Sequence, residues 1–595
     1  MPVALIGILL GAAFLRWAAP DNTPMWGDQA LTLGPALDFI HEGQIPLLGF
    51  RSSAHIYHSA LWIYLTIPPL ALIPRIISVR WFYSALDLLA IAFLYLAVRR
   101  CWSGRAAALS AWLYAVHPWL VEYNRLLWNP ALIVPASTVA LSALLLMLCS
   151  HSAALDRWIA VFVIGSAMVG GLHVVALPWM LGCWAVAALI ALRARRWRGM
   201  AIGLAITGAI NLPYMMYLLG PGLEDIKAAL YLSRSREPRT WHAIQVTGDL
   251  LMGRSIFHSG LGSLDSWRAS VLHVPVLDWV MPAVLAFALA VALYEIFSRS
   301  PQALTWAALF LWTVIPPLPN WFSSIHPQHY YMLHMFPAPL VAISASLLGR
   351  GIPSFPSALR ALRLILICGT VALSTWWAYV WWVRVRMEDQ HQLTLRTPAW
   401  AIERLSLAIA NYLQSDPHRM MVILEDSGLD ISAYDVIRAF LRTDRIRVVP
   451  AHTGLIIPHA SGCYLLTPGI PDSELSLASG LALQPMPPPM SDAPGWRIYC
   501  WDSPPTSSEP LGEWTNGLRL LDAHTEGDPW TSEAISVIHR WEYFGDPPYG
   551  KIYLFFNHLI SDDRLIAQAD GPGIHAFRWR PGDQIITRFR IPLPP

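Results

Sequence analysis

Long apolar runs constrain this chain more than any other feature of its sequence. The first extends from Val3 to Leu15, and ten more hold 17 to 21 residues each. These ten lie at 82–99, 105–121, 130–149, 157–173, 174–192, 199–219, 277–297, 302–318, 333–349 and 363–383. Because about 20 apolar residues cross the hydrocarbon core of a bilayer as a helix, the sequence predicts a polytopic α-helical membrane protein with about eleven transmembrane helices.

The composition supports an integral membrane protein. Of the 595 residues, 55% are hydrophobic and only 13% are charged, and the mean hydropathy is +0.43. The formal net charge of +2 gives no reason to expect nucleic-acid binding. The lipid bilayer is the partner that this composition predicts.

The chain changes character after residue 387, where apolar runs shorten and turn residues multiply. We predict a transmembrane domain over residues 1–387. Residues 388–508 alternate helical and strand patterns, which indicates a small α/β domain, and residues 509–595 hold short strands between turns, which favours a β-sandwich. Three aromatic residues of this region have two possible roles, namely packing in the core of the sandwich or stacking on a sugar. They are Trp541, Tyr543 and Trp579.

The segment 58–78 decides the predicted orientation of the later loops. It contains Pro68, Pro69 and Pro74, which suit a helix in the membrane interface better than a spanning one. With this assignment the Arg-rich loops face the cytoplasm, as the positive-inside rule requires. The segments then placed outside are 21–80, 121–130, 220–276 and 319–332, together with the tail. These polar loops predict a cavity on the outer face that suits a lipid-linked substrate.

Several motifs occur in an order that resembles a known family. A loop with Asp28 follows the first helix, an amphipathic segment with Gly43 comes next, and "NRLLWNP" (124–130) and "HPQHYYMLHMFP" (326–337) follow later. Over roughly residues 1–385 this order resembles the GT-C glycosyltransferases, especially the dolichyl-phosphate-mannose protein mannosyltransferase and aminoarabinose transferase group (glycosyltransferase family 39-like). The resemblance implies a GT-C fold with additional interfacial helices. It also implies transfer of a sugar from polyprenyl phosphate to an acceptor hydroxyl, with inversion.

By this resemblance Asp28 lies near the acceptor nucleophile. The reaction needs a group that deprotonates the acceptor and cations that stabilise the departing phosphate, so Asp28 is the candidate base. The alternative is that Asp28 caps the helix that follows it, since Asp is a favoured N-cap residue. Glu122 is the second catalytic candidate, and a structural salt bridge between Glu122 and Arg125 is an equally open alternative.

Two further groups of side chains complete the expected site. Guanidinium groups bind two phosphate oxygens at once, and a histidine fills a basic position of the resembled family. The residues expected to bind the donor phosphate are Arg51, Arg125, His55 and His58. The residues expected to bind the substrate are Asn129, His326, His329, Tyr330 and Tyr331.

Metal dependence is not expected. Gln29 and Asn129 stand where relatives in the resembled family carry acids, and Mg²⁺ or Mn²⁺ needs several hard oxygen ligands. We therefore expect no metal and no other cofactor, and a divalent metal is the alternative. A zinc site at His326, His329 and His334 is an alternative, although hydrogen bonding to sugar or phosphate fits their position better.

The expected location is the plasma (inner) membrane, with the active site and the tail outside the cytoplasm. The expected donor is a polyprenyl-phosphate-linked sugar, and the acceptor is a protein, a glycolipid or a polysaccharide. A transporter or flippase and a non-catalytic GT-C-like assembly partner are the alternative functions. A transporter should show internal repeats and polar groups at the bilayer midplane, and no such repeat is evident in the sequence.

The cysteines carry two further expectations. Cys101, Cys149, Cys183 and Cys368 lie in or beside apolar runs, where a small buried thiol is the expected state. Cys463 and Cys500 lie in the tail, where a disulfide is an open alternative if the tail faces an oxidising compartment.

Overall fold

The computed structural model of the protein describes most of the chain. The described residues are 2–20, 23–25, 27–51, 56–149, 154–227, 240–253, 277, 279–321, 328–349, 357–389, 397–426, 434–478, 480–488, 495–503, 509–528, 532–545 and 553–593. The chain forms two compact units, which we describe separately. The N-terminal unit consists of residues 1–25 and 35–399, and the C-terminal unit consists of residues 26–34 and 400–595.

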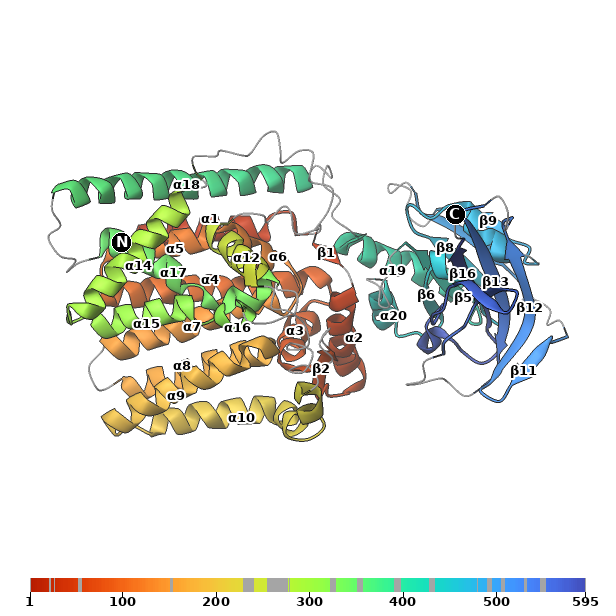
Figure 1. Ribbon diagram of the computed structural model, residues 1–595, viewed down its shortest axis with the longest axis horizontal. Coiled ribbons are helices and arrows are strands. Elements are labelled where there is room, and N and C mark those ends of the chain that lie inside the picture. The colour runs from red at the N-terminus through yellow and green to blue at the C-terminus, as the bar shows by residue number, and fades with distance from the viewer. Residues whose placement is uncertain are drawn as a thin grey trace. The chain divides into compact units, whose positions relative to one another are not determined.

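The N-terminal unit is built from helices (Figure 1). Its α-helices are α1 (Pro2–Trp17), α3 (Leu61–Leu72), α4 (Ile76–Cys101), α5 (Gly104–Val116), α6 (Pro118–Arg125), α7 (Pro130–Cys149), α8 (Leu155–Leu172), α9 (Leu177–Ala194), α10 (Arg198–Leu219), α12 (Thr240–Met252), α14 (Val280–Phe297), α15 (Ala303–Val314), α16 (Leu318–Trp321), α17 (Ala338–Leu348) and α18 (Ser357–Asp389). Its other elements are the 3₁₀ helices η2 (Val174–Ala176) and η4 (His329–Met335), the hairpin of β2 (Leu48–Arg51) and β3 (Tyr57–Ser59), and the pair β1 (Pro24–Met25) and β4 (Thr397–Pro398).

Seven helices within the described residues are long and apolar enough to cross a membrane. They are α4, α7, α8, α10, α14, α18 and the segment formed by η2 and α9. η4 and α17, which are bent by 46°, add an eighth span if they cross as one. α1, α5 and α15 contain only 16, 13 and 12 residues. At 1.5 Å per residue these helices extend about 18 to 24 Å, so the described residues do not reach the predicted count of about eleven.

The segment 58–78 contains one short helix, α3 (Leu61–Leu72), which includes Pro68 and Pro69. Its 12 residues extend about 18 Å, which is too short for the hydrocarbon core of about 30 Å. The next helix, α4, begins at Ile76. These lengths fit the interfacial assignment, and the orientation of the loops stays a prediction.

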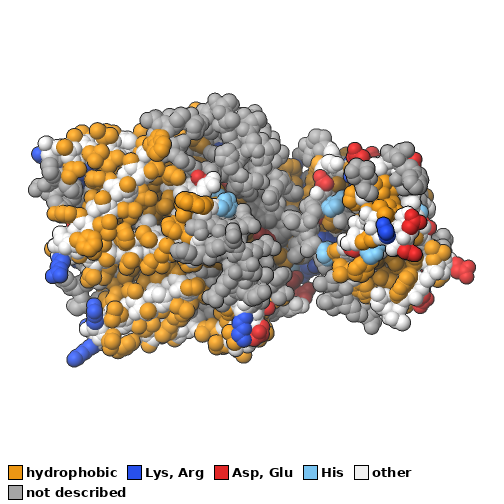
Figure 2. Space-filling view, viewed as in Figure 1, with side chains coloured by type: hydrophobic (Ala, Val, Ile, Leu, Met, Phe, Trp, Pro, Cys, Tyr) orange, Lys and Arg blue, Asp and Glu red, His pale blue; other side chains and the backbone are white. Residues whose placement is uncertain are grey.

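The surface of the N-terminal unit is apolar. In α9, the side chains of Leu181, Leu189 and Leu192 are about half exposed. Figure 2 shows hydrophobic side chains over most of the described face of this unit and few charged ones. Water-soluble proteins rarely expose so large an apolar surface, so the surface supports a multi-pass membrane protein.

The first sheet of the C-terminal unit is mixed, in the order β6–β5–β8–β10–β9. Its strands are β5 (Met420–Glu425), β6 (Ile446–Pro450), β8 (Gly462–Leu466), β9 (Gln484–Met486) and β10 (Arg497–Trp501). β5 runs parallel to β6 and to β8, and β10 is antiparallel to its neighbours. The helices α19 (Ala399–Gln414) and α20 (Asp435–Leu441) precede β5 and β6, which gives the alternation that the sequence indicates.

The second sheet is antiparallel, in the order β11–β12–β13–β16–β7. Its strands are β7 (Gly454–Ile457), β11 (Gly512–Trp514), β12 (Leu518–Glu526), β13 (Ala534–Tyr543) and β16 (Gln584–Pro592), and a separate hairpin joins β14 (His558–Ser561) to β15 (Arg564–Gln568). β7 comes from the region 388–508, yet it pairs with β16 so that Ile456 lies opposite Ile585.

The two sheets share one hydrophobic core. It joins Val422 and Leu424 of the first sheet to Ile538 and Ile585 of the second. The aromatic residues left open by the sequence belong to this core and are at most 9% exposed, namely Trp541, Tyr543 and Trp579. Core packing is therefore their role, and no ring among them presents a face for stacking on a sugar.

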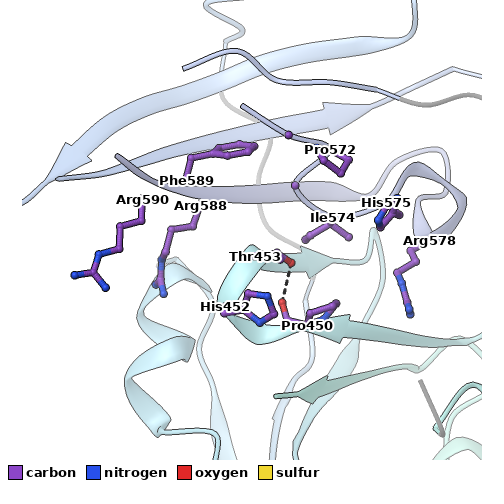
Figure 3. A pocket seen from close by; sticks show the side chains of 12 residues that line it. Pro450, His452, Thr453, Pro572, Ile574, His575, Arg578, Arg588, Phe589 and Arg590 are labelled. Atoms are coloured by element: carbon purple, nitrogen blue, oxygen red, sulfur yellow. Dashed lines mark hydrogen bonds between the residues drawn. The ribbon is translucent and has the colours of Figure 1, made fainter. Parts of the chain in front are cut away.

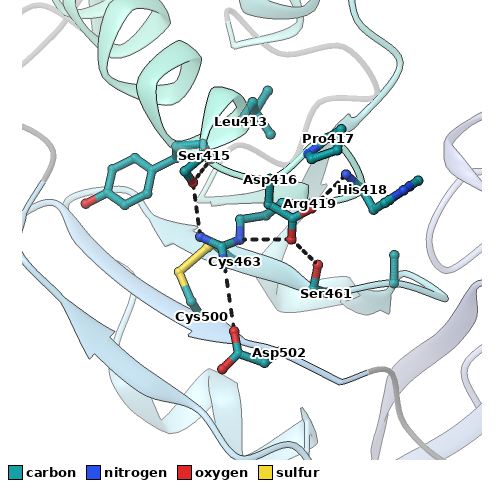
Figure 4. A network of polar contacts seen from close by, with 12 residues as sticks. Leu413, Ser415, Asp416, Pro417, His418, Arg419, Ser461, Cys463, Cys500 and Asp502 are labelled. Carbon is teal, nitrogen blue, oxygen red and sulfur yellow. Dashed lines mark hydrogen bonds and ion pairs between the residues drawn. A yellow bond between two sulfur atoms is a disulfide. The ribbon is translucent and has the colours of Figure 1, made fainter.

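Two disulfides connect elements within the units. Cys463 and Cys500 occupy opposed positions on β8 and β10, and Figure 4 shows their bond beside the polar contacts of Asp416 and Arg419. In the N-terminal unit Cys101 at the end of α4 is bonded to Cys149 at the end of α7, with their Cα atoms 5.6 Å apart. The expectation of free thiols is wrong at these two positions, because both helices end at the same place.

Asp583 makes the stability of the C-terminal unit depend on pH. Its side chain is 3% exposed. Burial raises its pKa from 3.8 to about 6, although the charge of Arg447 and the backbone N–H of Arg580 favour the ionised form. The folded state therefore holds this proton more tightly than the unfolded chain. The resulting stabilisation is complete below pH 3.8 and is lost as the pH rises through about 6, a free energy of about 3 kcal/mol.

We expect Asp583→Asn to remove this pH dependence. Between about pH 4 and pH 6.5 the thermal unfolding midpoint of the full-length protein should fall several degrees more in the wild type than in the variant. The matched control is Asp563→Asn, which makes the same change at an exposed position of this unit and should keep the wild-type profile. Identical profiles for wild type and Asp583→Asn would contradict the prediction.

Candidate functional site

Asp28 lies in the first turn of α2 (Gly27–Glu42), in the part of this helix that belongs to the C-terminal unit. Its side chain is partly exposed, and its carbonyl accepts a hydrogen bond from Thr32 Oγ1 at 3.0 Å. Because the helix begins at Gly27, Asp28 lies inside the helix and not at the N-cap. A carboxylate in the first turn still interacts favourably with the helix dipole.

One buried arginine binds residues 16–20 and Thr23, at and after the end of α1. Arg80 of α4 is 1% exposed and donates hydrogen bonds of 2.8–3.2 Å to four backbone oxygens between Arg16 and Pro20 and to Thr23 Oγ1. The first of these oxygens, that of Arg16, belongs to the last turn of α1, where carbonyls lack partners within the helix. Arg80 therefore fixes the chain where it leaves α1.

Glu122 and Arg125 belong to a buried group with Trp381 and Arg384, which we call the arginine–tryptophan cluster. Arg384 Nη1 lies 2.8 Å from Glu122 Oε2, and Nη2 lies 3.3 Å from Oε1. The guanidinium carbons of Arg384 and Arg125 lie 4.7 Å and 5.7 Å from the ring centroid of Trp381, where cation–π attraction acts. All four side chains are at most 5% exposed.

Two helices assemble this cluster. Glu122 and Arg125 are three residues apart on α6, as are Trp381 and Arg384 on α18, so each pair lies on one helix face. The four side chains carry two permanent positive charges and one negative charge. Such a group suits an anionic ligand, because a guanidinium binds phosphate or carboxylate with two parallel hydrogen bonds.

A second group, the histidine–tyrosine cluster, consists of His58, His173, Tyr330 and Tyr331. The ring of His173, at the end of α8, lies 5.3 Å from that of His58 and 5.4 Å and 5.3 Å from those of Tyr330 and Tyr331. His58 comes from the first loop on β3, and the tyrosines come from η4. The fold thus brings three of the predicted site residues together around one histidine that the sequence analysis missed.

Burial determines what His58 can do. Its side chain is 4% exposed, and burial lowers its pKa from 6.5 to about 4. The imidazole is therefore neutral near pH 7. It can contact a phosphate by a hydrogen bond and supplies no positive charge.

Asn129 lies next to the histidine–tyrosine cluster. Its Nδ2 donates a hydrogen bond of 2.7 Å to the carbonyl of Leu172, the residue before His173. Its buried Oδ1, like Nδ1 of His58 and Nε2 of His329, has no hydrogen-bond partner among the described residues. Leaving a buried polar atom unpaired costs about 1–3 kcal/mol. These atoms are therefore available to water or substrate. The indole nitrogen of Trp62 is also buried without a hydrogen-bond partner among the described residues.

α6, which carries Glu122 and Arg125, also contacts η4, the 3₁₀ helix that holds Tyr330 and Tyr331. The ring of Trp119 stacks on that of His329 at 4.0 Å, and on that of Tyr123 at 5.8 Å. His329 therefore lies against the helix that carries Glu122 and Arg125. The described residues contain no group of three or more His, Cys, Asp or Glu side chains that could hold a metal ion.

Three of the predicted site residues lie wholly or partly outside the described part of the chain. His55 and His326 lie outside the described residues. The backbone of Arg51 ends β2 opposite Tyr57, and its side chain also lies outside the described part.

Sequence reasoning missed several buried charges inside apolar runs or directly beside them. Arg16 of α1 and Asp87 of α4 form a buried salt bridge of 2.5 Å, and Tyr114 of α5 donates a hydrogen bond to the same carboxylate. An ionisable residue inside a membrane helix suggests a function or a buried pair. That signal was present for Asp87, for Arg80 and for Arg384 in "WWVRVR".

Comparisons with known proteins identify similar structures. No family model and no curated protein sequence matches this chain. The structure of ArnT from Cupriavidus metallidurans in the apo state matches with a TM-score of 0.51 and 13% identity, over 83% of this chain and 97% of that chain. The same protein bound to undecaprenyl phosphate matches with a TM-score of 0.50 and 14% identity, over 84% and 97% of the two chains.

A mycobacterial protein has a similar fold over part of its length. The arabinofuranosyltransferase AftD from Mycobacteria matches with a TM-score of 0.51 and 12% identity, over 86% of this chain and 40% of that chain. At these identities the likeness concerns the fold.

Proposed function

We propose, from the GT-C fold of this chain, that it is an inverting glycosyltransferase with a polyprenyl-phosphate sugar as donor. The arginine–tryptophan cluster is the observation that carries the proposal, because it sets two guanidinium groups in an apolar helical unit. A phosphate leaving group requires such cations. The undecaprenyl phosphate bound to ArnT, a protein of similar fold, supports the donor class.

In the proposed reaction the oxygen of an acceptor hydroxyl attacks the anomeric carbon as the bond between this carbon and the phosphate oxygen breaks. Asp28 takes the hydroxyl proton, and polyprenyl phosphate leaves with the bonding electrons. Attack from the opposite face inverts the anomeric centre. Arg125 and Arg384 stabilise the phosphate charge. The other residues proposed for the donor phosphate are Arg51, His55 and His58.

We assign the remaining site residues to contacts with the sugar and the acceptor. These are Asn129, His326, His329, Tyr330 and Tyr331. Glu122 acts in this proposal by holding Arg384 through their salt bridge, and this bridge would have to open before Glu122 could accept a proton. No metal takes part, because Gln29 and Asn129 replace two charged ligands.

The proposed location is the plasma membrane, with the active site outside the cytoplasm. The apolar surface of the N-terminal unit and its long helices support a multi-pass membrane protein. The acceptor, which is a protein, a glycolipid or a polysaccharide, is left open.

The proposal predicts that purified protein releases polyprenyl phosphate from a labelled undecaprenyl-phosphate sugar. A panel of such donors is incubated with an extract of the source cells as acceptor, and both lipid product and glycosidic linkage are measured. We expect release with inverted linkage, and a chelator should change the rate less than about twofold. Movement of intact donor across vesicles without release would indicate a transporter. Loss of release with chelator, restored by Mn²⁺, would contradict the metal-independent mechanism.

A further inference from the structure

The C-terminal unit contains a basic pocket that shares no residue with the proposed transferase site (Figure 3). Its volume is about 410 Å³, which lies within the range of small-molecule sites. The lining residues include Arg578, Arg588, Arg590, His452 and His575, and no Asp or Glu is among them. We propose that this pocket binds an acidic sugar residue, a hexuronate or a sugar phosphate, of a glycan.

Three distant segments of the chain form the pocket. His452 lies in the 3₁₀ helix η5 (Ala451–Thr453) between β6 and β7, the loop 571–575 follows β15, and the arginines at 588 and 590 lie on β16. The loop passes close to β16: a Cβ on Gly573, whose φ is +57°, would lie 2.9 Å from Thr587 Cγ2. Only glycine fits this conformation without strain. The pocket is therefore fixed by the fold where β6 and the second sheet meet.

The basic side chains are only partly neutralised. Arg588 pairs with Glu474 at 2.8 Å, and Arg578 lies 3.6 Å from Asp435. Arg590, two residues after Arg588 on the same face of β16, is exposed, and its side chain has no ion pair or hydrogen bond among the described residues. Figure 3 shows both of these arginines on the same side of the strand. The pocket thus keeps a positive charge that attracts an anionic group.

The other part of the lining is apolar. Pro572 is partly exposed and adds apolar surface to the lining, whereas Pro450, Ile574 and Phe589 are buried beside it. A sugar has C–H groups that pack on apolar side chains, and the carboxylate of a uronate or the phosphate of a sugar phosphate reaches a guanidinium. An inorganic anion would use only the basic side. The combination of both sides in one small pocket therefore favours an acidic sugar over a bare anion.

Such a site would give the C-terminal unit a role in holding an acidic glycan. The further step, that this glycan is the acceptor of the transferase, rests on the proposed function. Binding itself does not rest on it. We therefore measure binding without any donor, so that failure here leaves the transferase proposal intact and failure of sugar transfer leaves the pocket intact.

The test is titration calorimetry of the full-length protein in nanodiscs of uncharged lipid. The probes are methyl glucuronide, glucose 6-phosphate, neutral methyl glucoside, inorganic phosphate and a short-chain phosphatidylglycerol. We expect saturable binding of the two acidic sugars, weakened at least about tenfold by Arg590→Ala, since a charged hydrogen bond is lost. Arg590→Lys should retain part of the affinity. The matched control is Arg564→Ala, which removes an exposed arginine of β15 outside the pocket and should leave binding unchanged.

Several results would overturn the proposal. Equal binding of methyl glucoside would show that charge is not recognised, and equal binding of inorganic phosphate would show that the sugar is not. Arg590-dependent binding of phosphatidylglycerol alone would assign the pocket to a lipid headgroup. Unchanged affinity in Arg590→Ala, at an unchanged unfolding midpoint, would place any binding elsewhere. Absence of saturable binding by the wild type would also refute it.

Discussion

Asp28→Asn should lower the turnover of sugar transfer at least about 100-fold while leaving the protein folded. Asparagine keeps the shape of the side chain and cannot accept the proton of the acceptor hydroxyl, and a general base contributes roughly 10² to 10⁴ to a rate. The effect on stability should be small. A charge in the first turn of a helix stabilises it by only about 0.3–1 kcal/mol. Turnover, donor affinity and the unfolding midpoint are measured on the same preparation.

The matched control for this experiment is Asp38→Asn. Asp38 lies on the same helix, α2, ten residues later, and its side chain is exposed. The control should transfer sugar at the wild-type rate. Full turnover in Asp28→Asn would mean that Asp28 only stabilises the first turn of α2 and takes no part in catalysis. A loss of donor affinity without loss of turnover at saturation would assign Asp28 to binding.

The sequence predicted the long helices well and the short ones poorly. Each of α4 and α7 covers an unbroken apolar run. The run 105–121 instead contains Pro118, which begins a new helix and ends the spanning length of α5. Pro337 likewise separates η4 from α17 within the run 333–349. Hydropathy does not register such breaks, because proline interrupts a helix without making its surroundings polar.

The tail shows the same limit in β-structure. The strand patterns at β5, β6 and β16 were visible, because alternating or continuous apolar residues indicate strands locally. The pairing of β7 with β16 joins residues more than 120 positions apart, and no local pattern records a partner so distant. This pairing joins the two sheets around one core. The predicted domain boundary at residue 508 therefore stays a prediction based on sequence patterns.

The sequence indicated which residue types form the candidate site, and it indicated only some of the contacts between their side chains. Glu122 and Arg125 were singled out as charges beside the bilayer, and a bridge between them was the expected structural alternative. The partner that the fold supplies to Glu122 is Arg384, 262 residues away on the last long helix. His173 was passed over because a single histidine between apolar residues gives no pattern of its own.

The salt bridge between Glu122 and Arg384 gives the second large effect. Both side chains are at most 5% exposed, and removing one member of such a pair leaves a buried charge, at a cost of about 3–5 kcal/mol. Arg384→Met should therefore strongly lower the unfolding midpoint and the yield of folded protein. The double variant Glu122→Gln with Arg384→Met removes both charges and should recover most of the loss. The control is Lys227→Met, which breaks the exposed pair with Glu224 and should cost at most about 1 kcal/mol.

The double variant also separates the two roles of Glu122. If Glu122 only holds Arg384 and Arg384 binds phosphate, the folded double variant should bind the donor at least about tenfold more weakly. Saturating donor should then restore most of its turnover. If Glu122 is the base, turnover should stay at least about 100-fold low at any donor concentration. Full donor affinity and full turnover in the double variant would remove both residues from the site and leave their bridge as a purely structural link between α6 and α18.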